Sequence, residues 1–291
     1  MLTVFAMTAK GHAILESLVD VYGSSFIDQV IGAKDENIAD DYYTNIQEFC
    51  EQHQILFSDR SAQIVVHTQY AFAVSWRWLI DLNDTTRLIV FHDSLLPKYR
   101  GFAPLVNSLI NGEGKIGVTA LFANAEYDRG DVIYQSYSNV LYPVTIAEAI
   151  EIVNNNYRDA CITVAGMIAS DKPIPASTQN EAEASYSLWR DEEDYRINWN
   201  TEAAKVKRFI DATGYPYKGA STLMNGVLIR VLKAEIVEDV RIENRDAGKI
   251  IFVQDGKPVV VCGSGLLKII AATYESGESI LPIKKFRSRF N

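Results

Sequence analysis

The first half of the chain alternates short apolar runs, rich in β-branched residues, with stretches whose apolar residues recur at helical spacing. Continuous apolar strands separated by helices are typical of a parallel sheet covered on both faces. The sequence therefore predicts an α/β fold with a doubly wound, mostly parallel sheet. The predicted strands are 2–7, 27–33, 62–68 and 87–92, and the predicted helices are 11–23 and 40–54.

The later segments predict two further strands at one edge of this sheet, followed by a second, smaller domain. Strands at 117–123 and 131–138 are expected as a pair at one edge, and Thr145 is the expected N-cap of a helix over 145–171. After a polar connector and a helix at 202–213, turns of the type Asn-Gly and Asp-Gly separate short apolar runs, which predicts a small OB-like barrel. We predict a main domain over 1–180, a linker over 181–200 and an OB-like domain over 201–291. The predicted barrel strands are 219–225, 227–237, 248–254, 257–263 and 266–273.

Composition and charge narrow the class of protein. The cysteines, Cys50, Cys161 and Cys262, are odd in number and far apart, which indicates reduced thiols in a cytoplasmic protein. No Cys or His pair has zinc-ligand spacing, and no apolar run approaches the roughly 20 residues that span a bilayer, so we expect no metal and no membrane partner. The net charge is −9, with 27 acidic against 13 basic residues over 1–200 and 10 against 15 over 201–291. An acidic body disfavours polyanions, and we expect no DNA partner.

Two segments carry the candidate chemistry. His92 ends the strand "RLIVFH", at the edge where ligands bind doubly wound sheets, and imidazole is the side chain suited to acid–base work near neutral pH. Asp128 lies in the turn "NAEYDRGD" after the strand at 117–123, and we expect it at the same end of the sheet. Together the two groups could accept a proton from a nucleophile and stabilise an oxyanion. Taken singly, a histidine at a strand end such as His92 is more often a packed residue than a catalyst. An aspartate in a turn, such as Asp128, is more often a turn former.

The combination resembles the folate-dependent formyltransferases, which include methionyl-tRNA formyltransferase, the phosphoribosylglycinamide enzyme and the sugar N-formyltransferases. The similarity is carried by "FHDSLLPKYRG" at 91–101 followed by "YDRGD" at 127–131. A glycine-rich dinucleotide fingerprint and a P-loop are both missing from the first strand–helix turn. The resemblance implies a formyltransferase catalytic domain over 1–180, 10-formyltetrahydrofolate as co-substrate, and direct formyl transfer to a primary amine without a metal.

The resemblance also implies a set of binding residues. His92 and Asp128 would be catalytic, and Arg100 would either pair with a phosphate or brace its own loop. The residues implied for the folate are Ser75, Trp76, Arg77, Trp78, Leu79, Asn124 and Tyr127. The residues implied for the acceptor are Ser94, Leu96, Pro97, Arg100, Gly101, Tyr215 and Tyr217.

Val90 departs from the family pattern, which places an asparagine two residues before the histidine to hold the formyl oxygen. Valine has no donor, and the loss of one oxyanion donor typically lowers the rate about 100- to 1000-fold. Asn107, Asn124, Ser94 and a backbone amide are the candidates for a replacement donor. A non-catalytic protein that binds a folate or a nucleotide sugar is therefore a competing hypothesis.

The acceptor is predicted to be a nucleotide-linked amino sugar, as used in polysaccharide biosynthesis. The acidic first 200 residues disfavour tRNA, although the basic run "KKFRSR" at 284–289 keeps methionyl-tRNA formyltransferase as the alternative. The sequence leaves open the sugar, the nucleotide, the carbon that bears the amine, and whether the protein forms a homodimer.

Overall fold

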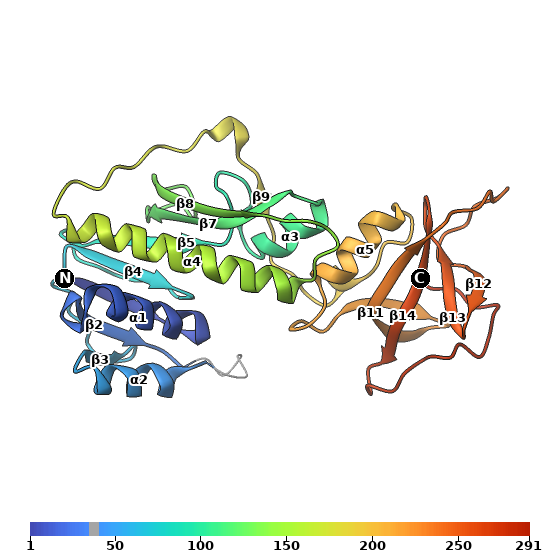
Figure 1. The fold of residues 1–291 in the computed structure, drawn as a ribbon, viewed down its shortest axis with the longest axis horizontal. Coiled ribbons are helices and arrows are strands. Elements are labelled where there is room, and N and C mark those ends of the chain that lie inside the picture. Colours follow the sequence, from blue (N-terminus) through green and yellow to red (C-terminus); the bar gives the residue numbers. More distant parts are fainter. Residues whose placement is uncertain (35–40) are drawn as a thin grey trace. The chain divides into compact units, whose positions relative to one another are not determined.

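The computed structural model describes residues 1–34 and 41–291, and its chain divides into two compact units. Figure 1 labels the helices and strands of both. The domain boundaries predicted at residues 180 and 200 stay a prediction. The first unit comprises 1–101, 116–138 and 152–186, and the second comprises 102–115, 139–151 and 187–291.

The first unit is built on a sheet that, over the described residues, has seven strands in the order β3-β2-β1-β4-β5-β7-β8. Strands β1 to β5 pair in parallel, and β7 pairs antiparallel with β5. The prediction of a mostly parallel sheet with a late pair at one edge is confirmed. The strands are β1 (Leu2–Ala6), β2 (Ile27–Gly32), β3 (Leu56–Asp59), β4 (Tyr70–Val74), β5 (Arg87–His92), β7 (Lys115–Phe122) and β8 (Val132–Asn139).

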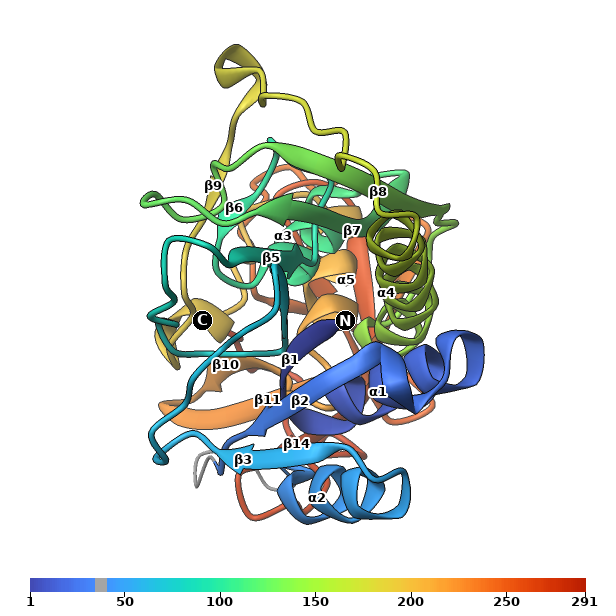
Figure 2. The same cartoon turned by 90° about the vertical axis from the view of Figure 1, so that its left-hand side faces the viewer.

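Helices lie along one side of this sheet, where Figure 2 shows α1 and α4 together. They are α1 (Thr8–Tyr22), α2 (Tyr43–Gln52) and α4 (Ile146–Ala169). Residue 40, where the second predicted helix begins, lies outside the described residues. Helix α4 begins with a capping box, because Thr145 Oγ1 accepts from the Glu148 N–H while the Glu148 carboxylate accepts from the Thr145 N–H.

Within the described residues, extended chain covers the opposite side of the sheet. The strand predicted at 62–68 is wrong: this segment forms no strand, and β4 begins at Tyr70. Val66 is buried against Phe5 and Ala71 of the sheet, and Thr68 Oγ1 lies 2.8 Å from Thr3 Oγ1. Ile64, Val65 and Val66 form a continuous β-branched run of the kind that is typical of a buried strand, which explains the error.

The second unit contains an antiparallel sheet within residues 220–274, all of which are described. Its order is β10-β11-β14-β13-β12, and the predicted five short strands are confirmed. Trp199 anchors the core of the unit, and its indole N–H donates to Thr222 Oγ1 (3.0 Å). Among the described residues, no helix is both long and apolar enough to cross a bilayer. The elements are α3 (Pro104–Asn111), α5 (Ala203–Ala212), β10 (Ala220–Met224), β11 (Val227–Val237), β12 (Ile250–Gln254), β13 (Lys257–Val261) and β14 (Leu266–Tyr274).

Candidate active site

His92 is the last residue of β5, and its strand fixes the side of the sheet that it faces. Side chains alternate along a strand, and Phe91 packs against Tyr157 of α4, with ring centroids 5.3 Å apart. Leu88 packs in the cluster that contains Phe5 on the opposite side. Val90 and His92 therefore share the side of the sheet that extended chain covers. His92 is buried there, with 9% of its surface exposed.

The loop that follows His92 is held in place by buried polar contacts. Thr119 of β7, opposite His92 in the sheet, donates through Oγ1 to Ser94 O (2.7 Å) and accepts from the Leu96 N–H (3.1 Å). The Ser94 hydroxyl donates to Lys98 O (2.7 Å). Ser94 and Leu96 are buried and Pro97 is half-buried. The predicted acceptor-binding loop is thus a rigid part of the first unit.

Asp128 lies near His92 although β7, the strand before it, ends at the other end of the sheet. Since β7 runs antiparallel to β5, β7 ends beside the start of β5, where the Ala123 N–H donates to Leu88 O (2.9 Å). The loop over 124–131 must return along the sheet to place Asp128 near His92. Gly130 permits this course, because a Cβ at that position would lie 1.7 Å from Phe122 O.

The two predicted catalytic side chains lie together. His92 Nδ1 is 3.5 Å from Asp128 Oδ1, and His92 Nε2 is 2.8 Å from Tyr99 O. A carbonyl oxygen only accepts, so Nε2 carries a proton and Nδ1 is the ring nitrogen that faces the carboxylate. Asp128 Oδ2 accepts from the Gly101 N–H (2.8 Å). Asp128 and Tyr99 both have φ near +60°, a conformation that non-glycine residues rarely adopt and that concentrates at functional sites.

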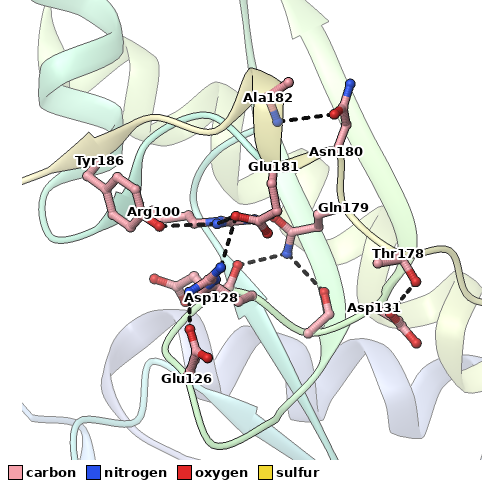
Figure 3. Close-up of polar contacts among 12 residues, drawn as sticks. Arg100, Glu126, Asp128, Asp131, Thr178, Gln179, Asn180, Glu181, Ala182 and Tyr186 are labelled. Carbon is pink, nitrogen blue, oxygen red and sulfur yellow. Dashed lines mark hydrogen bonds and ion pairs between the residues drawn. The ribbon is translucent and has the colours of Figure 1, made fainter.

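Arg100 braces the site from within the protein. Its guanidinium is fully buried and donates to both carboxylate oxygens of Glu181 (2.7 and 2.9 Å) and to Gln179 Oε1 (2.8 and 3.1 Å). Tyr186 accepts a further bond at 3.2 Å. Figure 3 shows these contacts beside the loop that carries Asp128. Of the two roles left open for Arg100, these contacts favour the brace over a phosphate ligand.

The hydrogen bonds from Arg100 lower the pKa of Glu181 to about 2. A carboxyl whose pKa falls on folding stabilises the protein above its unfolded pKa, near 4.3, and loses that contribution as the pH falls toward the folded value. We expect Glu181→Gln to lower the Tm at pH 6, and the difference from wild type to vanish as the pH falls from about 4.5 to 2. Differential scanning calorimetry tests this, with Glu183→Gln in the same segment as control. A Tm difference that persists at pH 2 would contradict it.

The segment predicted for the folate lies on the same side of the sheet as His92. Trp76 packs against Phe5 with centroids 5.2 Å apart, and the Arg60 guanidinium lies 4.1 Å over the Trp78 ring. The indole N–H of Trp76 is buried and has no hydrogen-bond partner among residues 1–34 and 41–291. Ser75 is half-buried with φ +54°, whereas Arg77 and Leu79 are exposed.

The other predicted ligand residues are more scattered. Asn124 and Tyr127 are exposed in the loop before Asp128, and Asn124 Oδ1 accepts from the Glu126 N–H (3.0 Å). Tyr215 and Tyr217 are exposed in the second unit. Asn107, a candidate replacement donor, also belongs to the second unit, where its amide donates to Ala103 O and accepts from Arg190.

The residues that join the loops at 93–101 and 124–131 were not predicted from the sequence. Gln179, Glu181, Ser185 and Tyr186 belong to a segment that was expected to be a connector or linker. The Tyr99 N–H donates to Ser185 Oγ, and the Arg100 N–H donates to Ser185 O, both at 2.9 Å. No periodicity marks such residues. The one available signal is Arg100, because an arginine in a loop between apolar residues requires an acidic partner if it is buried. Among the described residues, no group of three or more His, Cys, Asp or Glu could hold a metal ion.

Family comparisons fit this architecture. The model of the formyl transferase domain matches residues 33–163, and the model of the formyl transferase C-terminal domain matches residues 190–291. The chain belongs to the formyl transferase family.

Individual relatives differ in what they act on. A methionyl-tRNA formyltransferase of Streptococcus equi subsp. equi is 30% identical over 207 residues, which cover 70% of this chain and 64% of the relative. An N-formyltransferase from Helicobacter canadensis, solved with folinic acid and dTDP-3-aminofucose, has a TM-score of 0.69 at 15% identity and covers 92% of this chain and 98% of its own. HypX from Aquifex aeolicus has a TM-score of 0.62 at 16% identity, and the match covers 96% of this chain and 45% of HypX. At these identities the structural likeness shows the fold. The chain matches 62%, 55% and 64% of the first three curated relatives.

Proposed function

We propose that this protein transfers a formyl group from 10-formyltetrahydrofolate to a primary amine, with His92 and Asp128 as its catalytic residues. The observation that carries the proposal is the 3.5 Å separation of His92 Nδ1 and Asp128 Oδ1, which brings together the end of β5 and a loop distant in the sequence. The pair is largely withdrawn from water, with 10% and 18% of the two side chains exposed. Family membership supplies the reaction class, and the pair supplies the proton acceptor that it requires.

The pair has a defined task in this reaction. A primary amine must lose a proton as its nitrogen bonds to the formyl carbon, and the folate nitrogen must gain one as the donor's carbon–nitrogen bond breaks. The pair takes the first proton and returns it to the leaving folate nitrogen. Asp128 Oδ1 is the more exposed group and accepts that proton, which His92 Nδ1 then shares. The Tyr99 carbonyl fixes the ring orientation by holding Nε2–H, and the Gly101 N–H fixes the carboxylate.

Residues 75–79, on the same side of the sheet as His92, have features that suit a folate. The bound co-substrate would supply the formyl group. The unpartnered indole N–H of Trp76 is a donor without an acceptor, and such buried donors are rare in native proteins. Trp78 offers a second ring 5.4 Å from Trp76 in the same segment, and aromatic rings are suited to flat heterocycles. Residues 75–79 would hold the pterin.

For the acceptor, a nucleotide-linked amino sugar is the first candidate. Binding of tRNA depends on basic groups that release counterions from phosphates, but residues 1–200 hold 27 acidic against 13 basic residues. The only arginine in the acceptor loop at 93–101 is Arg100, which is fully buried and paired with Glu181. A structural neighbour that was solved with dTDP-3-aminofucose supports the same choice.

Methionyl-tRNA is the second candidate, favoured by the curated relatives at 27–30% identity that carry that name. One experiment separates the candidates: the protein is incubated with 10-formyltetrahydrofolate and either a panel of nucleotide-linked amino sugars or charged initiator tRNA, and mass spectrometry follows formyl gain. We expect one of the sugars to gain a formyl group. A formyl group gained by tRNA alone would make methionyl-tRNA the acceptor. If neither gains one, a protein that binds its ligands without turnover is favoured.

The substitution Val90→Asn tests whether the missing amide donor limits the rate. An asparagine there would face the same side of the sheet as His92 and would supply the amide donor that valine lacks. Because one oxyanion donor is worth about 100- to 1000-fold in rate, and because another donor can already fill part of that role, we expect Val90→Asn to raise kcat about 10- to 100-fold. Steady-state kinetics with the preferred acceptor measure this. Val90→Leu, which matches asparagine in size and has no donor, serves as the control. An unchanged kcat in Val90→Asn would show that another group already supplies the whole donor role.

A further inference from the structure

We propose that Gln179 is a positioning residue that sets the Asp128 carboxylate against His92. This inference rests on the proposed function for its meaning in catalysis. Gln179 lies about 50 residues after Asp128, in the segment that follows α4, and 7% of its surface is exposed. The hydrogen bonds that it donates go to backbone carbonyls of the Asp128 loop, so its effect on the carboxylate passes through that backbone.

The side chain of Gln179 spans from Arg100 to that loop. Its Nε2 donates to Asp128 O (2.7 Å) and to Gly130 O (2.9 Å), while its Oε1 accepts two bonds from Arg100 (2.8 and 3.1 Å). Figure 3 shows Gln179 between the two. The amide orientation is unambiguous, because Oε1 meets only donors and Nε2 meets only acceptors.

These contacts hold a residue whose backbone is otherwise unfavourable. Asp128 has φ +59°, and such a conformation persists only where the surroundings determine it. On one side Gln179 fixes the carbonyl of Asp128, and on the other side the Gly101 N–H fixes its carboxylate. Arg100 links both anchors, since it precedes Gly101 in the chain and donates to Gln179.

The segment around Gln179 is itself secured. Ser177 and Val132 exchange two backbone hydrogen bonds (2.8 and 2.9 Å). Glu181 forms ion pairs with Arg100 and Arg129. Thr178, the neighbour of Gln179, donates instead to Asp131 Oδ1 (3.1 Å) at the surface. The segment therefore offers one residue that holds Asp128 and an adjacent one that binds the same loop elsewhere.

Gln179→Glu is the sharpest test. The substitution keeps the size and the two acceptor positions for Arg100, but it places an acceptor against the carbonyls of Asp128 and Gly130. A misplacement of about 1 Å in an active site can lower the rate about 100-fold. We expect kcat to fall about 100-fold with KM for the folate within about threefold. Thr178→Val, the matched control, should leave both within about twofold.

A spectroscopic measurement makes the outcome independent of turnover. In ¹⁵N–¹H spectra of the ring nitrogens, Gln179→Glu should shift the His92 signals in the same direction as Asp128→Asn does, whereas Thr178→Val should not. Unshifted His92 signals in a folded Gln179→Glu protein would overturn the proposal, even if the rate fell. Shifted signals in a protein without transferase activity would keep the positioning role and reject the proposed reaction. Gln179→Met, which adds no charge, decides the question should the glutamate variant not fold.

Discussion

Replacing His92 by alanine is expected to lower kcat for formyl transfer about 1000- to 10,000-fold while the fold persists. The ring is the partner of Asp128 in proton transfer, and general acid–base groups contribute about 100- to 10,000-fold. The upper part of that range is expected because both ring nitrogens have assigned partners, Tyr99 O and Asp128 Oδ1, so that water cannot take over the same geometry. Single-turnover kinetics with the preferred acceptor measure the effect.

The control for His92 is a histidine of the same chain outside the site. His53 follows helix α2 and packs against Phe49, with ring centroids 4.4 Å apart. His53→Ala should retain turnover within about threefold. Turnover of His92→Ala close to that of His53→Ala, in a protein with native circular dichroism, would remove the imidazole from the mechanism.

Asp128→Asn is expected to lower kcat about 1000-fold with little change in Tm. The amide oxygen can still accept from the Gly101 N–H, so the loop should keep its course. The amide nitrogen would then face His92 Nδ1 and donate to it, which leaves neither group able to accept the proton of the amine. The substitution thus separates the chemistry of the carboxylate from its structural bond.

The matched control for Asp128 is Asp131→Asn, three residues along the same loop. Asp131 Oδ1 accepts from the exposed Thr178 hydroxyl, and the residue lies outside the contact with His92. Its kcat should stay within about threefold of wild type. Equal losses in Asp128→Asn and Asp131→Asn would assign the effect to the loop as a whole and not to the carboxylate at Asp128.

The sequence allowed the scaffold of the site to be predicted because local patterns specify it. An apolar run that ends in a polar residue marks the end of a buried strand, and β5 ends at His92 as predicted. The run at 62–68 also ends in polar residues but forms no strand, because its β-branched residues pack on the face of the sheet from extended chain, as Val66 does. Periodicity reports which side chains are buried, and two different backbones can bury the same ones.

The bracing of the site could not be predicted because it depends on contacts between distant residues. Arg100 and Gln179 are 79 positions apart, and neither carries a spacing signal. The position of Asp128 depends likewise on the antiparallel course of β7 and on the close approach at Gly130. Such contacts form only once the sheet has assembled, and local propensity holds no information about them.

The most direct test of the central claim is a double-mutant cycle on His92 and Asp128, with single-turnover formyl transfer as the measurement. Residues that act as one unit give losses that do not add. If the pair shares the amine proton, the protein with both His92→Ala and Asp128→Asn should be no more than about threefold slower than the slower single variant. Losses that multiply in the double variant would show that the two side chains act independently and would contradict the account.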